Sequence, residues 1–335
     1  MKFRIYKAMP AYPGYLKSFY KEHPYFSTKT FPEQIELHQN NCFQWILTWQ
    51  NNNVDSEVEV FETISNDFVM QNTWAGKRYK SGEDWERAIV LEQIKTFRPD
   101  VCIIYPPEQY DFSFVEKIRE MADGVIIGGY DGMDRQNASL YKGYDFVLTC
   151  SKHISSYYHD KGIPSYPMSF GFDKSVLNKL SASIKYGVGF SGSLYPKLHS
   201  DRFDFLSFLL NNVQITISSE FGYFEKIVSR RPIRQLKQVG LNRWEDYFRL
   251  CHHNIGPLYG IDMYQFLSNC AVVLNMHGNA IRFAANIRLF EATGVGTCLL
   301  TDWKENLPSL QQLMRQEMNN PIVIIANMIL EGRDI

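Results

Sequence analysis

Short apolar runs alternate with segments of helical periodicity along most of this chain. In the first half, the apolar runs have the length of buried strands and the segments between them have the apolar spacing of helices. Such an alternation predicts a parallel sheet with helices on both faces. The expected strands are 2–8, 58–64, 101–105, 124–128 and 146–150, and the expected helices are 33–49, 85–97, 114–121 and 151–161, the last capped by Ser151.

The same alternation restarts after Phe172. Residues 173–186 are polar and interrupt it, so we place a domain boundary there. The sequence predicts an α/β fold with two Rossmann-like, doubly wound parallel-sheet domains, residues 1–172 and 173–335. In the second half the expected strands are 188–191, 213–218, 271–274 and 297–301, and the expected helices are 202–210, 262–268 and one that starts near 283–285.

Composition narrows the class of protein. The chain has 335 residues, enough for two domains, and its net charge of -1 argues against a protein that neutralises nucleic-acid phosphates. No apolar run approaches the roughly 20 residues of a membrane span, and the N-terminus lacks the apolar core of a secretory signal. The six cysteines contain no C-x-x-C pair. They predict reduced, mostly buried thiols in a cytoplasmic protein.

Residues 270–302 form the most informative segment. An apolar run ends in a polar loop, a helix-like segment follows, and a second apolar run ends in Thr301-Asp302. Ligands of parallel sheets bind beyond the carboxyl ends of the strands, so this βαβ unit predicts a binding site. Arg288 and Glu291 are three residues apart and share a helix face. They form either an exposed ion pair of little energetic value or part of the site, where a carboxylate can accept hydrogen bonds from both hydroxyls of a diol.

Two further features could bind phosphate. The expected helix start near 283–285 would present free N–H groups, and Arg282 just before it could add charge-assisted hydrogen bonds; the alternative is an ordinary solvated arginine. The turn Gly189–Ser193 either approaches a ligand closely at Gly192 or is a tight strand exit, and it is not a full G-x-G-x-x-G motif. The nearby Tyr195, Lys197 and Arg202 could face a ligand or water.

Four stretches of the sequence resemble glycosyltransferases of the GT-B fold, and in particular the CgeB-like, spore-maturation branch of that group. Residues 162–173, with Gly162-Ile-Pro and Phe170-Gly-Phe-Asp173, look like the end of the family's first domain. Residues 188–193 are similar to the strand–glycine turn that opens the second domain of the family. Residues 264–276 look like the helix and strand before its donor site. Residues 286–301, Asn-Ile-Arg-Leu-Phe-Glu-Ala-Thr-Gly-Val-Gly-Thr-Cys-Leu-Leu-Thr, resemble the family's Arg-x-Phe-Glu-Ala…Gly core.

The resemblance implies transfer of a sugar from a nucleotide-sugar donor, UDP-, GDP- or TDP-linked, to a sugar, glycan or protein acceptor. The second domain would hold the donor and the first would face the acceptor. Carried over residue by residue, Glu291 would bind the ribose hydroxyls. Gly192, Ser193 and the loop from His277 to Arg282 would lie near the pyrophosphate. The donor site assigned in this way comprises Gly192, Ser193, His277, Arg282, Asn286, Arg288 and Glu291.

The chain departs from the family in two places. Residues 282–285 lack the second glutamate of many retaining GT-B enzymes, and residues 311–335 do not resemble the closing segment, which leaves open whether the second domain is complete. One alternative is therefore a truncated or degenerate homologue that binds a nucleotide or a protein without turnover. Another is a nucleotide-sugar epimerase, for which the convergent acid–base groups are not visible.

An inverting GT-B enzyme also needs a base on its first domain. Asp131, expected just after a strand and among glycines, is the first candidate; the alternative is a turn-forming aspartate. His153, at the start of the helix after the strand 146–150, is the second, although it could simply pack. The pair His252-His253 and the residues Asp131 and Asp134 lack metal-ligand spacing, so we expect no essential metal and no cofactor beyond the donor.

One cationic stretch could contact another molecule. Residues 230–243 carry five basic side chains beside Trp244. They indicate a solvated loop or, alternatively, a peripheral contact with an anionic acceptor or a membrane surface.

Overall fold

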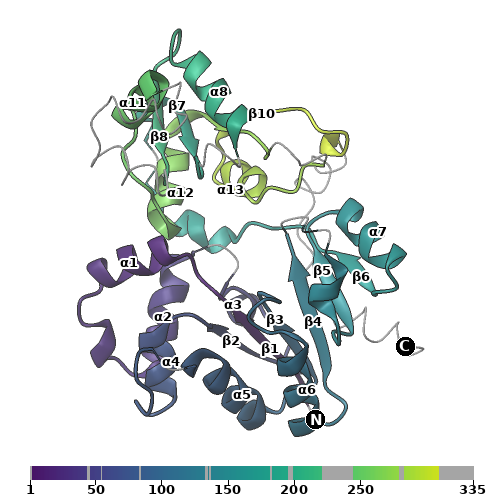
Figure 1. The fold of residues 1–335 in the computed structure, drawn as a ribbon. Coiled ribbons are helices and arrows are strands. Elements are labelled where there is room, and N and C mark those ends of the chain that lie inside the picture. The colour runs from purple at the N-terminus through teal and green to yellow at the C-terminus, as the bar shows by residue number, and fades with distance from the viewer. Residues whose placement is uncertain are drawn as a thin grey trace. The chain divides into compact units, whose positions relative to one another are not determined.

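The structure is a computed structural model that describes residues 2–43, 46–53, 55–82, 84–132, 135, 137–181, 183–194, 199–220, 244–278 and 283–308. The chain divides into two compact units between Phe170 and Gly171. Figure 1 shows the helices and strands of both units.

The first unit is built on a six-stranded sheet in the order β2-β1-β3-β4-β5-β6, in which every neighbouring pair is parallel. Its strands are β1 (Phe3–Met9), β2 (Val58–Ile64), β3 (Val101–Ile104), β4 (Ile126–Asp131), β5 (Phe146–Thr149) and β6 (Ser165–Pro167). Its helices are α1 (Pro13–Glu22), α2 (Phe31–Asn41), α3 (Trp49–Asn52), α4 (Phe68–Trp74), α5 (Trp85–Phe97), α6 (Phe112–Met121) and α7 (Lys152–Asp160).

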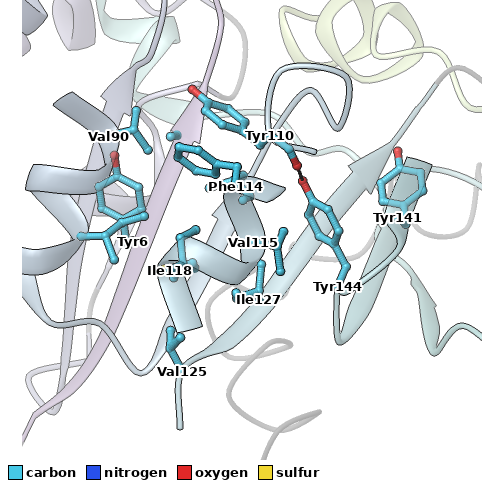
Figure 2. Packing of buried hydrophobic residues seen from close by; sticks show 14 of the residues in the cluster. Tyr6, Val90, Tyr110, Phe114, Val115, Ile118, Val125, Ile127, Tyr141 and Tyr144 are labelled. Carbon is cyan, nitrogen blue, oxygen red and sulfur yellow. Dashed lines mark hydrogen bonds between the residues drawn. The ribbon is translucent and has the colours of Figure 1, made fainter. Parts of the chain in front are cut away.

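Aromatic and branched side chains form the core between this sheet and its helices. Figure 2 shows Tyr6 of β1 and Ile127 of β4 packed with Phe114 of α6. The tyrosines of this core need partners for their hydroxyls, because a buried unpaired hydroxyl is costly. The hydroxyl of Tyr144 donates to the carbonyl of Tyr110 at 2.6 Å, as the dashed line in Figure 2 marks.

A buried ion pair joins the two strands at one edge of the first sheet. Lys7 of β1 and Glu62 of β2 are register partners, both wholly buried, and Lys7 Nζ lies 2.7 Å from Glu62 Oε1. The ammonium group also lies 4.4 Å from the ring centroid of Trp49, and Glu62 Oε2 accepts from the backbone N–H of Gln50 at 2.7 Å. Burial raises the pKa of Glu62 and lowers that of Lys7, and their mutual attraction opposes both shifts.

The second unit has a four-stranded parallel sheet in the order β10-β9-β7-β8. β7 pairs with β8 on one side and with β9 on the other, so the strand order reverses between β7 and β9. The strands are β7 (Tyr186–Ser191), β8 (Ile215–Ser218), β9 (Cys270–Asn275) and β10 (Cys298–Thr301). The described helices are α8 (Ser200–Leu209), α11 (Trp244–His252), α12 (Gly260–Ser268) and α13 (Arg288–Gly294).

Both sheets confirm the predicted pair of Rossmann-like, parallel-sheet α/β arrangements. The strand 58–64 and the helix 85–97 have the predicted bounds, and Ser151 caps α7 by accepting from the N–H of His153. The single helix expected over 33–49 is wrong. Helix α2 ends at Asn41, because Cys42 takes the left-handed conformation, and α3 starts only at Trp49. The sequence pattern also missed α1, α4 and α11.

The strand expected over 124–128 is β4, which runs from Ile126 to Asp131. The two glycines in it do not end the strand. A Cβ on Gly128 would lie 2.4 Å from the ring of Phe146, and one on Gly129 would lie 2.7 Å from the ring of Tyr141. They are glycines because aromatic rings pack directly on the strand backbone. Asp131 is therefore the last strand residue rather than a turn residue.

The helix expected to start near 283–285 also starts later. Helix α13 begins at Arg288, whose N–H is capped by the side chain of Asn286 at 2.9 Å. Before it, the backbone of Ala284 makes two hydrogen bonds of 2.7 Å with the side-chain amide of Asn306, which holds it outside the helix. Glu291 consequently lies in the first turn of α13 and not near its end.

All six cysteines are free thiols, as predicted, and three of them are buried: Cys42, Cys102 and Cys270. Within the described part of the chain, no helix combines the length and the apolar character that a membrane span requires.

The buried pair in the first sheet yields a prediction. Lys7→Met leaves the carboxylate of Glu62 buried without its cation, which we expect to lower the free energy of unfolding by about 3–5 kcal/mol. The double variant Lys7→Met/Glu62→Gln should recover most of this loss, because a glutamine carries no charge and can still accept from the Gln50 N–H. Urea denaturation of the three proteins measures both effects. Equal losses in the single and double variants would instead assign the effect to lost packing on Trp49.

Candidate functional site

The strand order of the second unit places its candidate site. The chain leaves β7 toward β8 and leaves β9 toward β10, which lie on opposite sides, so the loops after β7 and β9 diverge. Ligands of open parallel sheets bind beyond the carboxyl ends of the strands at such a switch point. The loop after β7 contains Gly192 and Ser193, and the loop after β9 contains Met276 and His277.

Arg202, near the start of α8, ties these two loops together. Its guanidinium donates to the carbonyl of Ser193 at 2.7 Å, and to the carbonyl of Met276 at 2.6 Å and 3.1 Å. The residue is 7% exposed, so it faces neither open solvent nor a free surface. Burial lowers the pKa of Arg202 to about 10; Asp302 acts in the opposite direction, and Arg288 adds to the lowering. Arg202 is therefore close enough to Asp302 and to Arg288 for their charges to interact.

His277 is fixed by the residue that follows β10. Asp302 Oδ1 lies 2.7 Å from His277 Nδ1 and accepts from the His277 backbone N–H at 3.0 Å. The other carboxylate oxygen lies 3.3 Å from Lys304 Nζ. Partial burial raises the pKa of Asp302, but the hydrogen bonds from His277 and the charges of His277 and Lys304 outweigh it and hold the pKa well below its usual range. The His277 side chain has no exposed surface, and its Nε2 has no hydrogen-bond partner among the described residues.

Asn286 connects the strand ends to α13. Its Nδ2 donates to Asn275 Oδ1 at 2.9 Å, and Asn275 Nδ2 donates to Thr301 Oγ1 at 2.9 Å. Asn286 Oδ1 accepts from the backbone N–H of Arg288. Both ends of the Asn286 side-chain amide therefore form hydrogen bonds within the protein. The residue therefore positions α13 against β9 and β10.

Arg288 and Glu291 form an ion pair, as their spacing predicted, with 2.8 Å between Arg288 Nη1 and Glu291 Oε2. The alternative of an exposed pair is wrong, because the side chains are only 14% and 2% exposed. Burial raises the pKa of Glu291, while Arg288 and a hydrogen bond with Tyr264 act in the opposite direction. Arg288 Nε is buried and has no hydrogen-bond partner among the described residues.

Asp131 in the first unit is wholly buried at the carboxyl end of β4. The Tyr158 hydroxyl donates to its Oδ2 at 2.7 Å, and Arg135 Nη1 lies 3.4 Å from its Oδ1. Arg135 also pairs with Glu108 at 3.0 Å and donates to the Tyr105 hydroxyl at 2.9 Å. The carboxylate thus lies in a buried polar network.

His153 has the opposite environment. It follows β5 as the second residue of α7, and its side chain is exposed. Of the two base candidates, His153 is the exposed one and Asp131 the buried one. The geometry alone tests neither Asp131 nor His153 as the base, so both assignments stay predictions.

Several predicted positions lie outside the described residues. They are Arg282, Tyr195, Lys197, Asp134 and the basic residues of 230–243, together with residues 311–335. Among the residues that are described, no three histidine, cysteine or acidic side chains gather in a way that could hold a metal ion. The rings of His252 and His253 lie nearly perpendicular to each other at 5.7 Å.

The structure gives defined contacts to two residues that the sequence does not assign to the donor site, Asp302 and Arg202. Asp302 directly follows a strand in the βαβ unit, and that position is itself a signal for a site residue. Arg202 lies ten residues after Gly192, in a helix, and nothing in its spacing indicates that it turns back to the loop carbonyls.

Comparison with known proteins finds a family whose model matches part of the second unit. A family model described as glycosyl transferase-like matches residues 222–315. The described part of that segment holds β9, α13, β10 and the His277–Asp302 pair. No curated protein matches the chain.

Two solved structures cover nearly the whole chain. HepE from Anabaena, in complex with UDP-glucose, is 12% identical, with 99% of this chain and 90% of that chain covered and a TM-score of 0.51. AviGT4, a glycosyltransferase involved in avilamycin A biosynthesis, is 10% identical, with 93% and 82% covered and a TM-score of 0.52. The fold is GT-B. At these identities the likeness shows the GT-B fold alone, and residues 222–315 are in addition glycosyltransferase-like in sequence.

Arg202 yields a prediction for the second unit. Arg202→Met removes the donors that hold the carbonyls of Ser193 and Met276, and each unsatisfied buried carbonyl costs about 1–3 kcal/mol. We expect a lower free energy of unfolding, measured by urea denaturation. Arg202→Lys should recover only part of the loss, because a lysine keeps the charge but lacks the planar fork of donors. Full recovery by lysine would mean that charge, and not the bridging geometry, stabilises the loops.

Asp302 yields a pH prediction. Its lowered pKa means that the unfolded chain binds its proton more readily than the folded chain does. The ionised group therefore stabilises the fold above the usual aspartate range of about pH 4, and this contribution is lost as the pH falls toward the lower folded pKa. Thermal unfolding should show a gap between the wild-type protein and Asp302→Asn that is largest near neutrality and shrinks in acid. The exposed control Asp201→Asn should show no such trend, and a gap independent of pH would contradict the prediction.

Proposed function

We propose that this chain is a glycosyltransferase that moves a sugar from a nucleotide-sugar donor to an acceptor. The observation that carries the proposal is the polar cluster at the switch point of the second sheet. Arg202, His277 and Asp302 lie there, and the Arg288–Glu291 pair lies at the start of α13, close enough to Arg202 for the charges of the two arginines to interact. All of these residues except Arg202 lie in the segment that is glycosyltransferase-like in sequence. Packing of helices on a sheet does not by itself require so many buried charged groups. Ionisable groups in such environments are concentrated at functional sites.

The donor diphosphate is assigned to the loops after β7 and β9. Gly192 and Ser193 offer backbone groups, and His277 and Arg282 offer side chains. The cations already at this edge, Arg202 above all, favour an anionic ligand. Diphosphate is the leaving group of sugar transfer, and groups that stabilise its developing charge accelerate the reaction.

The donor ribose is assigned to Glu291, with Asn286 and Arg288 as supporting residues. A carboxylate has about four acceptor sites, so pairing with Arg288 does not use up its capacity. Glu291 is 1% exposed, so a ribose reaches it only if the groups that cover it move. The described hydrogen bonds of Asn286 support a positioning role for that residue rather than direct contact with the donor.

The acceptor is assigned to the first unit. In an inverting reaction, a base takes the proton of the attacking acceptor hydroxyl while the bond between the sugar and the diphosphate breaks. The exposure of His153 favours it as that base. The burial of Asp131 and its bonds to Tyr158 and Arg135 favour a supporting role for the aspartate.

The finer assignments rest on the sequence resemblance. They are the CgeB-like branch, a hexosyl donor linked to UDP, GDP or TDP, independence of metal, a sugar, glycan or protein acceptor, and a cytoplasmic location. HepE was solved with UDP-glucose, which makes that donor the first to test.

Glu291 provides the decisive experiment. Calorimetric titration of the full chain with UDP, GDP, TDP and their sugar conjugates should find one nucleotide that binds with a dissociation constant on the order of micromolar. Glu291→Gln keeps the shape but loses the charged acceptor. Since hydrogen bonds to charged groups contribute about 1.5–3 kcal/mol, affinity should fall by about 10- to 150-fold.

Glu245→Gln is the matched control, because Glu245 is an exposed carboxylate on α11 of the same unit. It should bind as the wild-type protein does, and thermal unfolding checks that each variant folds. Binding unchanged in Glu291→Gln would remove Glu291 from the donor site. No binding of any nucleotide by the wild-type chain would overturn the transferase proposal and leave the non-catalytic homologue.

A further inference from the structure

One nitrogen in the candidate donor site has no hydrogen-bond partner within the part of the chain that the structure describes. His277 Nδ1 lies 2.7 Å from Asp302 Oδ1, and an ionised carboxylate can only accept, so Nδ1 carries a proton. Nε2, on another edge of the ring, is buried and has no hydrogen-bond partner among the described residues. A buried polar atom without a partner costs free energy, so it needs an explanation such as a bound water, an ion or a functional role.

The protonation state of Nε2 decides what this nitrogen can do. With Nδ1 committed to Asp302, a neutral ring presents a bare lone pair at Nε2, which repels an anion. A doubly protonated ring presents an N–H donor there and keeps its bond to Asp302. An anionic oxygen that comes close to Nε2 therefore favours the protonated ring.

The charged groups of this part of the second unit come from several elements. Asp302, which contacts the ring, and Lys304 follow β10, and Arg202 comes from α8. Arg288 and Glu291 come from α13, where Arg288 is close enough to Arg202 for their charges to interact. A diphosphate would add negative charge at the Nε2 edge of the ring, which Asp302 does not occupy. That added charge favours the protonated ring.

We propose that the donor diphosphate binds together with one proton, which the solvent supplies to His277 Nε2 and which this nitrogen then donates in a hydrogen bond to a phosphate oxygen. Asp302 is the positioning residue that fixes the ring and the tautomer. No covalent bond to the protein forms or breaks. During transfer, the same N–H would stabilise the charge that gathers on the leaving diphosphate. This inference rests on the proposed function, since it assigns a role within the same site.

Proton uptake can be measured directly by calorimetry of the full chain. The probe is UDP-glucose, with GDP-mannose and TDP-glucose as replacements, because the diphosphate of a nucleotide-sugar has no ionisation near neutrality that would confuse the count. Titrations at one pH in two buffers, PIPES and Tris, differ in heat in proportion to the protons taken up. We expect uptake approaching one proton, and an affinity that falls by up to about tenfold per pH unit as the pH rises above the imidazole range.

Two variants separate the proton from the contact. His277→Asn keeps a donor to Asp302 but has no group at the Nε2 position, so it should bind more weakly and without proton uptake. His277→Gln places an uncharged N–H near the Nε2 position, so it should recover part of the affinity, still without uptake. Asp302→Asn should reduce the uptake, which a merely structural role for Asp302 would not do.

The outcomes distinguish this inference from the function on which it rests. Equal heats in the two buffers for a wild-type protein that binds its nucleotide-sugar would overturn the inference and leave the transferase proposal intact. Uptake that persists in His277→Asn would assign the proton to another group and would also overturn it. If the wild-type chain binds none of the three probes, the proposed function fails, and the inference fails with it. The buffer comparison needs only the wild-type protein, so it decides the matter even if a variant does not fold.

Discussion

Parallel strand pairing is the constraint on which the candidate site depends. It brings the carboxyl ends of β7, β9 and β10 to one edge of the second sheet, although residues 191 and 301 are far apart in the sequence. Reversal of the strand order between β7 and β9 then separates the loops that follow them. Arg202 spans that separation with hydrogen bonds to both loops. Gly192, Ser193, His277 and Asp302 occupy one region because the sheet and this one guanidinium hold them there.

Buried charge has different consequences in the two units. In the first, Lys7 and Glu62 neutralise each other between neighbouring strands, and Asp131 lies in a network with Tyr158 and Arg135. The described hydrogen bonds of these groups go to other parts of the protein. In the second unit, His277 Nε2 and Arg288 Nε are buried with no described hydrogen-bond partner. Unsatisfied buried groups destabilise a fold unless a ligand or water completes them. The first unit also has such atoms, at Gln34, Asn41 and Ser65, but those of His277 and Arg288 belong to ionisable side chains of the candidate site.

The GT-B fold alone does not define the chemistry of this protein. Folds of this kind support many functions, and the function lies in the residues at the strand ends. The structures of HepE and AviGT4 support the GT-B fold, whereas the glycosyltransferase-like match covers residues 222–315. The inference of donor binding therefore depends on the geometry of the second unit and on the sequence of that segment together.

The alternation of strands and helices can be predicted from the sequence alone, as can the pairing of Arg288 with Glu291 and the strand-end position of the donor candidates. These follow from periodicity and spacing, which are local properties. The burial of this ion pair, the place of Gly128 and Gly129 inside β4 and the start of α13 at Arg288 became visible only in the folded protein. The same holds for the place of Arg202 and Asp302 in the site. Each of these depends on contacts between residues distant in the chain, such as Phe146 on Gly128 or Asp302 on His277, and neither composition nor periodicity carries that information.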